Sequence, residues 1–321
     1  MRKKSGKVFL GMEEVIKLSF KVIEGFYDCD EDGKKIGIFS GFQSLDHFIG
    51  GFKYGDVTVI AGRPGSGKST FAFQTAYNAA SKFRNTVGLI TLKLSLEQLG
   101  MKFICFKSGL DSSRIGGGLI SRFDWPRLTS AAGQLVDASI YVDDCPSESI
   151  GELVRRIMDL KAERQEVKLV VIDSLQMIVS ENRGKLSECL KRIKMAAQSM
   201  QLSVIITSSI NSVRNQKDNR GTMGDPIYQL IEGYSDLLLL LKEHDTNFVI
   251  SSGNNNDGAY RDPLSTKGKN RTPAKEDSNV NKSELLTRVR TELIVAKNKK
   301  GPTGTLFLDY YPERGRFKDI A

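Results

Sequence analysis

Residues 57–80 read VTVIAGRPGSGKSTFAFQTAYNAA, and this stretch decides the fold. Its first six residues, VTVIAG, form a short apolar run typical of a buried strand, and STFAFQTAYNAA is typical of a helix. Between them, GRPGSGKS matches the pattern G-x-x-x-x-G-K-[ST] in full. A loop between such a strand and helix turns its N–H groups and the positive helix end toward a bound anion. The stretch therefore predicts a nucleotide-binding site.

The residue types of this loop predict separate roles in that site. Glycines at 62, 65 and 67 let the backbone wrap closely around phosphates. Lys68 would reach the β- and γ-phosphates, and Ser69 would ligate Mg²⁺. The predicted cofactors are ATP and Mg²⁺. The predicted nucleotide contacts are Gly62, Arg63, Pro64, Gly65, Ser66, Gly67, Lys68, Ser69 and Thr70.

Outward from this loop, short apolar runs alternate with helical patterns between residues 38 and 241. The further strand candidates are 86–92, 139–144, 168–175, 202–209 and 235–242, and the helix candidates are 68–82, 95–108, 124–137, 148–165 and 184–200. Continuous apolar strands separated by helices predict an α/β fold with a mostly parallel sheet covered on both faces. Two alternating runs around KKGPTG, within 291–312, predict a C-terminal β-hairpin.

A second site residue is predicted at the end of KLVVIDSL, residues 168–175. Ligands of open α/β sheets bind at the carboxyl ends of the strands, so Asp173 is predicted to hold the metal together with Ser69. Asp143 and Asp144, which end another apolar run, are an alternative. For these two a role in a turn or helix cap is favoured.

The composition limits the classes of protein and partner. The chain has 321 residues, 40% hydrophobic and 26% charged, as in an ordinary globular protein. Neither a bilayer-spanning run nor a signal peptide is present, so we expect a soluble, cytoplasmic protein without a membrane partner. Four widely spaced cysteines and two histidines suit neither a zinc site nor a disulfide framework. The net charge of +9 permits a polyanionic partner without requiring one.

Two segments lie outside the alternating pattern. Residues 12–26 place apolar side chains on one helical face, and a polar, acidic stretch follows at 27–37. We predict that residues 1–36 form an N-terminal arm or linker helix and that 37–321 form the main domain; packing of the helix on its own domain is the alternative. Residues 251–284 are poor in large aliphatic residues and predict a mobile insertion. An expanded loop is favoured there over a DNA-contacting arm.

GIFSGFQSLDHFIGGFKYGDVTVIAGRPGSGKST (37–70) resembles the start of the motor domain of DnaB-type replicative helicases, a branch of the RecA-like ATPases. The resemblance continues, in family order, through LVVIDSLQMI (169–178), ITSSIN (206–211), IEGYSDLLLLL (231–241) and IVAKNKKGPTGT (294–305). The ordered set is far more specific than the phosphate loop alone. It implies a RecA-like P-loop NTPase fold and an ATP-dependent DNA helicase acting in DNA replication, which unwinds duplex DNA by translocating on single-stranded DNA.

The resemblance also implies partners. Family members form hexameric rings, hydrolyse nucleotide between subunits, and dock a helix like 12–26 on the neighbouring subunit. We therefore expect a homo-oligomer, with a hexameric ring as the leading form, and single-stranded DNA as a ligand. A helicase loader or primase is a further candidate partner. The family's N-terminal collar domain is expected to be absent from this chain.

The chain departs from the family at the catalytic base. The family has a glutamate in the sequence S-L-E-M after the strand, and alignment from Val87 puts Lys93 in its place. A shifted register makes Glu97 the base instead, at the cost of an insertion and a matching deletion, so Lys93 is favoured. A positioned base contributes about 10²–10⁴-fold in rate. A lysine could still contact phosphate, which would favour binding over turnover.

Other family positions differ as well. The family's γ-phosphate-sensing glutamine corresponds to Ser209, and its arginine finger to Lys299, with Lys297 matching a family lysine. A lysine keeps the charge but loses the bidentate fork of arginine. The family's DNA-contacting loop aligns with 225–233, which carries Ile227 and Tyr228. The predicted DNA-binding residues are Arg214, Lys217 and Arg220, and the predicted catalytic residues are Lys68, Asp173, Glu97 and Lys299.

Two functions remain open from these differences. The leading one is a DnaB-type helicase motor. The alternative is a catalytically weak paralogue that binds ATP and single-stranded DNA in a structural or regulatory role. A RecA-like recombinase or a helicase-loader ATPase is disfavoured by the order of the motifs near the C-terminus.

Overall fold

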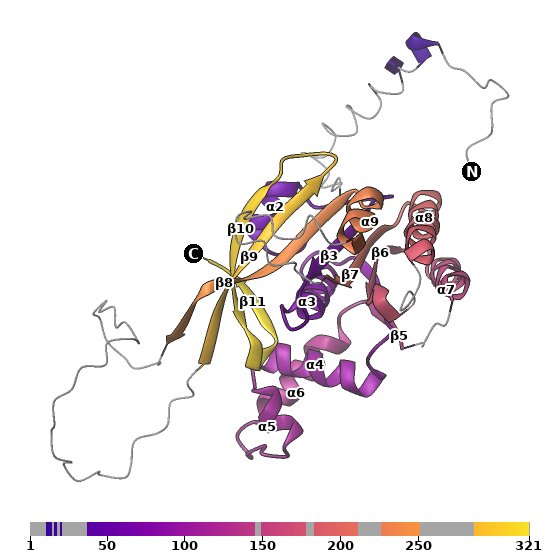
Figure 1. The fold of residues 1–321 in the computed structure, drawn as a ribbon. Coiled ribbons are helices and arrows are strands. Elements are labelled where there is room, and N and C mark those ends of the chain that lie inside the picture. Colours follow the sequence, from indigo (N-terminus) through magenta and orange to yellow (C-terminus); the bar gives the residue numbers. More distant parts are fainter. Residues whose placement is uncertain are drawn as a thin grey trace, which may run out of the picture.

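Nine strands form the central sheet of the computed structural model, which describes residues 11–14, 16, 17, 20, 37–144, 149–177, 183–210, 226–250 and 286–320 (Figure 1). The strands are β3 (Val57–Gly62), β4 (Thr86–Thr91), β5 (Ile140–Asp143), β6 (Val167–Asp173), β7 (Ser203–Ser209), β8 (Leu237–Ile250), β9 (Leu286–Asn298), β10 (Gly304–Tyr311) and β11 (Arg316–Asp319). A separate antiparallel pair is formed by β1 (Gly37–Ile38) and β2 (Phe52–Lys53).

The sheet has the order β11-β10-β9-β8-β3-β7-β6-β4-β5. The six strands from β8 to β5 are parallel, and β9, β10 and β11 add an antiparallel edge. The mostly parallel sheet and the hairpin of β9 and β10 confirm the predicted fold class. The register pairs Gly62 with Ser209 and Thr91 with Asp173, so the carboxyl ends of β3, β7, β4 and β6 lie along one edge. We call this the carboxyl edge.

Helices cover both faces of the sheet. They are α2 (Gln43–Ile49), α3 (Lys68–Ser81), α4 (Leu96–Ser108), α5 (Ser112–Gly116), α6 (Trp125–Val136), α7 (Ile150–Glu163), α8 (Arg183–Met200) and α9 (Pro226–Tyr234), with short 3-10 turns η1 (Leu175–Met177) and η2 (Pro312–Arg314). One core cluster joins α2, α3 and α4 to the sheet, with Phe42 stacked on Phe71. The other joins α7, α8 and α9 to the opposite face. Each fully buried Phe or Leu stabilises the fold by about 1.5–3 kcal/mol.

The start of α4 is fixed by its own sequence. Ser95 is the N-cap residue and accepts a hydrogen bond from the Gln98 N–H, while the Gln98 side chain accepts one from the Ser95 N–H. This capping box satisfies two N–H groups that the first helical turn leaves free. Gly109 ends the helix in the left-handed region, at φ 69°. The capping box therefore fixes the start of α4 directly after Ser95.

The segment 225–233, expected to belong to a DNA-contacting loop, is helical over most of its length. Residues 226–234 form α9, in which Tyr228 and Ile231 are buried in the core cluster shared with α7 and α8. Their spacing of three residues places both on one helical face. Ile227 and Tyr228, which the sequence carries in this segment, therefore pack against the core, Tyr228 as a buried residue and Ile227 as a partly buried one.

The two segments outside the alternating pattern are described only in part. Residues 12–14, 16, 17 and 20 are helical, and Met12, Ile16 and Phe20 are exposed. The insertion at 251–284 lies outside the described residues, and β8 and β9 flank it as a long antiparallel pair from Leu237–Asn298 to Ile250–Leu286. Across the described ranges, every helix is too short or too polar to cross a bilayer.

Candidate nucleotide-binding site

The phosphate loop lies between β3 and α3, at the carboxyl edge. Gly67 has φ 83°, and a Cβ there would come within 2.7 Å of the Phe317 ring. A Cβ at Gly62 would lie 2.5 Å from the Leu241 carbonyl oxygen. Glycine is therefore required at Gly67 for conformation and space, and at Gly62 for space. The structure brings the nine predicted contacts, residues 62–70, together in this loop and the first turn of α3.

Lys68 is the buried cation of the loop. Its exposed fraction is 7%, and its Nζ donates a hydrogen bond to the Arg63 carbonyl oxygen at 2.5 Å. Burial and, to a smaller extent, the nearby Lys93 ammonium lower its pKa to about 8, although Asp173 acts in the opposite direction. The charge of Lys68 is thus held at the mouth of the loop with little compensation from protein acids, as an anion-binding site requires.

Ser69 and Asp173 meet beside Lys68. The Ser69 hydroxyl donates to Asp173 Oδ1 at 2.8 Å, and the Thr207 hydroxyl donates to the same oxygen at 2.5 Å. Asp173 is 1% exposed at the tip of β6. Mg²⁺ is bound in proteins through one or two oxygen side chains plus water and substrate phosphate. The hydroxyl and carboxylate present here fit that donor set, and the structure brings the two predicted metal ligands together.

Lys93 is the residue predicted to stand at the position of the family's catalytic base. It follows β4 at the carboxyl edge, close enough to Lys68 to act on its pKa. Glu97 lies in the first turn of α4, is exposed, and accepts a hydrogen bond from the Ser95 hydroxyl at 2.6 Å. That bond lowers the pKa of Glu97. The register in which Lys93 takes the family glutamate's place stays a prediction, as does the alternative role of Glu97 as base.

The two other acids considered for the site have structural partners. Asp143 forms an ion pair with Arg156 at 2.7 Å, and Asp144 accepts a hydrogen bond from the Leu96 N–H at 3.3 Å. The second contact is at the start of α4, so Asp144 has the helix-cap role favoured from the sequence.

Lys299 lies at the opposite edge of the sheet. Its backbone N–H donates to the Asp236 carbonyl oxygen, and the Asp236 N–H donates to the carbonyl oxygen of Val57, the first residue of β3. The phosphate loop begins at the other end of the same strand, five residues further on, which is about 16 Å at the rise of a β-strand. The structure therefore does not bring Lys299 to the Lys68 of its own chain.

The predicted DNA-binding residues Arg214, Lys217 and Arg220 lie outside the described residues. The chain leaves the described part directly after Ile210, whose N–H donates to the Gly62 carbonyl oxygen at 3.1 Å. Their role as DNA contacts therefore stays a prediction.

Sequence reasoning missed a set of residues that support the loop from the C-terminal strands. Gln74 on α3 donates to the Phe317 carbonyl oxygen at 2.9 Å and accepts from its N–H at 2.7 Å. Tyr310 stacks on Phe317 with ring centroids 4.3 Å apart, and it shares a side-chain hydrogen bond with Thr70. The contacts join α3 to β10 and β11, more than 200 residues away in sequence, so no local pattern indicates them.

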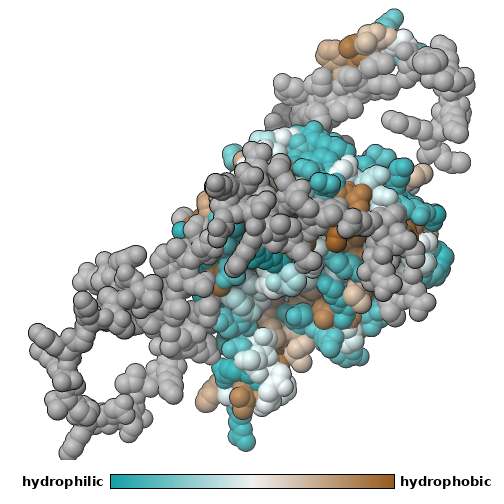
Figure 2. All heavy atoms as spheres, viewed as in Figure 1, coloured by the Kyte–Doolittle hydropathy of each residue, from teal (hydrophilic) through white to brown (hydrophobic). Residues whose placement is uncertain are grey.

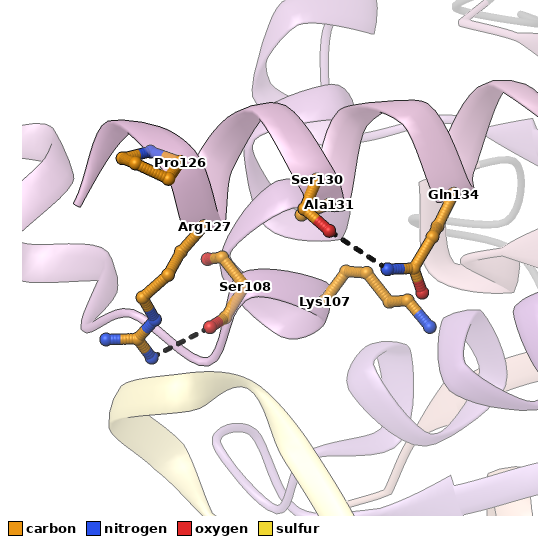
Figure 3. A pocket seen from close by; sticks show the side chains of 7 residues that line it. All are labelled: Lys107, Ser108, Pro126, Arg127, Ser130, Ala131 and Gln134. Atoms are coloured by element: carbon orange, nitrogen blue, oxygen red, sulfur yellow. Dashed lines mark hydrogen bonds between the residues drawn. The ribbon is translucent and has the colours of Figure 1, made fainter. Parts of the chain in front are cut away.

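A hollow separate from this site lies between α4 and α6 (Figure 3). Arg127 donates to the Ser108 carbonyl oxygen at 2.9 Å, and Gln134 donates to the Ser130 hydroxyl at 3.3 Å. None of the predicted site residues lines it. On the face seen in Figure 2, the described surface is mostly hydrophilic, with smaller apolar groups. Leu119, Phe123 and Trp125, between and within α5 and α6, are among the exposed hydrophobic residues.

The chain is similar in sequence to known replicative helicases. The chain is 29% identical to the replicative DNA helicase DnaB of Geobacillus stearothermophilus and 28% identical to the replicative DNA helicase DnaC of Bacillus subtilis (strain 168). Each comparison covers 99% of this chain and 64% of the relative, so the chain spans less than two-thirds of the length of these relatives.

Solved structures share the fold. A DnaB-like replicative helicase, determined with its interactions with primase, has a TM-score of 0.71 at 23% identity over 98% of this chain and 68% of that one. A KaiC-like protein from Pyrococcus horikoshii OT3 has a TM-score of 0.53 at 16% identity over 88% of this chain and 98% of that one. These likenesses identify the sheet and its helices as a RecA-like ATPase fold.

The family model described as the DnaB-like helicase C terminal domain matches residues 37–319. The matched range includes the phosphate loop, Asp173 and the C-terminal hairpin. The chain therefore belongs to the family of DnaB-like helicase C-terminal domains.

Proposed function

We propose that this chain is the ATP-dependent motor of a DnaB-like replicative DNA helicase, which unwinds duplex DNA by translocating on single-stranded DNA. The observation that carries the proposal is the junction of the phosphate loop with Asp173, through the 2.8 Å hydrogen bond from Ser69. Family membership supports it, because the similar curated proteins are named replicative DNA helicases.

The residues of the site have defined tasks in this proposal. The N–H groups of residues 62–70 and the start of α3 would hold the phosphates of ATP. Lys68 would bind the terminal phosphates, and Ser69 and Asp173 would hold Mg²⁺. A bound Mg²⁺ supplies positive charge that stabilises the phosphates during transfer. The chain's own contribution is to position these groups in a site closed on one side by β7 and α3.

The position of Lys299 supports assembly into a ring. In this proposal its ammonium, at the far edge of the sheet from Lys68, would act on a nucleotide held by another copy of the chain in a hexameric ring. Residues 1–36 would act as the arm or linker between subunits, and 37–321 as the motor domain with its insertion at about 251–284. Arg214, Lys217 and Arg220 would contact the DNA, a helicase loader or primase is the further partner, and the protein would act in the cytoplasm.

A second candidate function is favoured by Lys93. In this reading the chain is a DnaB-like paralogue that binds ATP but turns it over slowly, in a structural or regulatory role. Lys68 and Lys93 would both lie near the phosphates. Lys93 lowers the pKa of Lys68, and Asp173 is the acid that raises it. This arrangement would strengthen binding of a polyanion while leaving the attacking water without a base.

One set of assays separates these functions. The purified full chain is tested for Mg–ATP binding, for ATP hydrolysis with and without single-stranded DNA, and for separation of a forked duplex. The proposal predicts Mg–ATP binding that Lys68→Ala abolishes, together with slow, DNA-stimulated hydrolysis and ATP-dependent strand separation. Binding without strand separation would favour the paralogue. A turnover of about tens per second, typical of efficient enzymes, would rule the paralogue out.

A further inference from the structure

Gln176 forms a side-chain link between the ends of two neighbouring strands. It lies in η1, the short turn that follows β6, and this turn is anchored by Leu175, which is 1% exposed in the core. The Gln176 Nε2 donates to the Ser208 hydroxyl at 2.7 Å and to the Ser209 carbonyl oxygen at 2.8 Å. Both amide hydrogens of Gln176 are therefore used on the end of β7.

The same two strands are linked a second time at the metal-binding position. Asp173 Oδ1 accepts hydrogen bonds from both Thr207 on β7 and Ser69 on the phosphate loop. A ligand that draws Asp173 therefore acts on the hydrogen bond from Thr207 as well as on the one from Ser69. The last three residues of β7 are all held by side chains from the end of β6 and from η1. Asp173 accepts from Thr207, and Gln176 donates to Ser208 and Ser209.

The hydrogen bonding around Gln176 is incomplete. Its Oε1 and the hydroxyl of Ser174 are buried and have no hydrogen-bond partner among the described residues. A buried polar atom without a partner costs about 1–3 kcal/mol, and such atoms are usually satisfied by water or ligand. Ser174 follows Asp173 directly, and the carboxamide of Gln176 lies at the end of β7. The two atoms are suited to water brought in with a bound nucleotide.

We infer that Gln176 is a positioning residue that couples occupancy of the phosphate site to the carboxyl end of β7. The inference rests on the proposed nucleotide binding. Movement of Asp173 when the site fills would carry η1 with it, because only Ser174 and Leu175 separate Asp173 from Gln176. The carboxamide then transmits that movement to Ser208 and Ser209. A backbone route also exists, through the hydrogen bond from the Ile210 N–H to Gly62, and the experiment below separates the two.

Amide hydrogen exchange of the segment 203–210 tests the coupling without requiring turnover. The full chain is measured with and without Mg²⁺ and a non-hydrolysable ATP analogue. Wild type is expected to show exchange slowed by about tenfold on binding, a coupling of ordinary size. Gln176→Met keeps the side-chain volume but removes both donors. It should bind the analogue within about threefold of wild type and lose the slowing.

The controls distinguish this inference from the proposed function. Gln198→Met makes the same change on the exposed face of α8 and should behave as wild type. Ser208→Ala removes one acceptor and should lose part of the slowing, which keeps the test available if Gln176→Met does not fold. Retention of full slowing in both variants, or no slowing in wild type that binds the analogue, would overturn the coupling. Failure of wild type to bind the analogue would instead overturn the proposed function.

Discussion

Lys299 forms an ion pair with the buried carboxylate of Asp236 at 2.8 Å, on the edge of the sheet away from the phosphate loop. The other Asp236 oxygen accepts from Lys194 at 2.5 Å and from the Val57 N–H at 2.9 Å. Lys299 is half exposed, whereas Asp236 and Lys194 are largely buried. The carboxylate therefore holds one lysine for the fold and presents the other at the surface, where a neighbouring subunit could meet it.

This asymmetry predicts different effects on stability. Asp236→Ala should lower the free energy of unfolding by about 1.5–3 kcal/mol, because it removes the charged hydrogen bond from the largely buried Lys194, whose remaining carboxylate partner is Asp56 at 3.3 Å. Lys299→Ala should lower it by only about 0–1 kcal/mol, since an exposed ion pair is screened by water. Urea unfolding of both variants measures the difference. Equal losses would show that Lys299 is itself part of the structural core.

The stability contributed by Asp236 should depend on pH. Burial alone would raise its pKa, but hydrogen bonds from Lys194, Lys299 and the Val57 N–H outweigh burial, so the pKa lies below the usual value. A depressed carboxyl pKa stabilises the fold above the unfolded value, about 3.9, and this contribution is lost as the pH falls through the folded pKa. Acid unfolding should therefore be shifted to higher pH in Asp236→Asn. An unchanged acid midpoint would contradict the assignment.

Lys93→Glu should raise ATP turnover by about 10²–10⁴-fold, the usual contribution of a positioned general base. The variant places a carboxylate where Lys93 now acts on Lys68. Steady-state hydrolysis with single-stranded DNA measures the change. Lys93→Gln serves as the matched control, because it removes the positive charge without adding an acid. An equal gain in both variants would show that charge removal, and not a new base, is responsible.

Glu97→Gln should leave turnover within about twofold of wild type, because loss of a general base would cost about 10²-fold or more. Glu97 is exposed and bonded to Ser95 at the start of α4. The same hydrolysis assay tests it, with Glu163→Gln at the end of α7 as a control far from the loop. A large loss confined to Glu97→Gln would make Glu97 the base and overturn the Lys93 register.

Nucleotide affinity should weaken above pH 8. The pKa of Lys68 is lowered to about 8 by burial and by Lys93, and bound phosphate favours the charged form. The affinity for Mg–ATP is therefore highest below the pKa that Lys68 has in the nucleotide-free protein. It falls as the pH rises through that pKa, by up to about tenfold per pH unit. Titration of Mg–ATP between pH 7 and about 9.5 measures this. Lys93→Ala should move the onset to higher pH, and an unmoved onset would contradict the influence of Lys93.

The sequence predicted the parts of the fold that local patterns encode. The strand, loop and helix at 57–81 and the alternating strands up to β8 were correctly predicted, because continuous apolar runs and helical periodicity are strong signals. Helix α9 was missed because Pro226 and the following apolar residues resemble the end of a loop. The partners of Lys299 and the contacts of Gln176 depend on residues far apart in the chain, which the fold alone brings together.

The antiparallel pairing of β8 with β9 has a practical consequence. The two strands stay paired, through two register shifts, up to Ile250 opposite Leu286, so the segment between these residues leaves and re-enters the sheet at adjacent positions. The ends of any replacement segment would need to meet across a single strand spacing, about 4.8 Å. Loop-closure entropy changes slowly with length, so a short turn or a whole folded domain can be grafted there at small thermodynamic cost. A fluorescent reporter at this point would leave the phosphate loop and the far edge of the sheet intact.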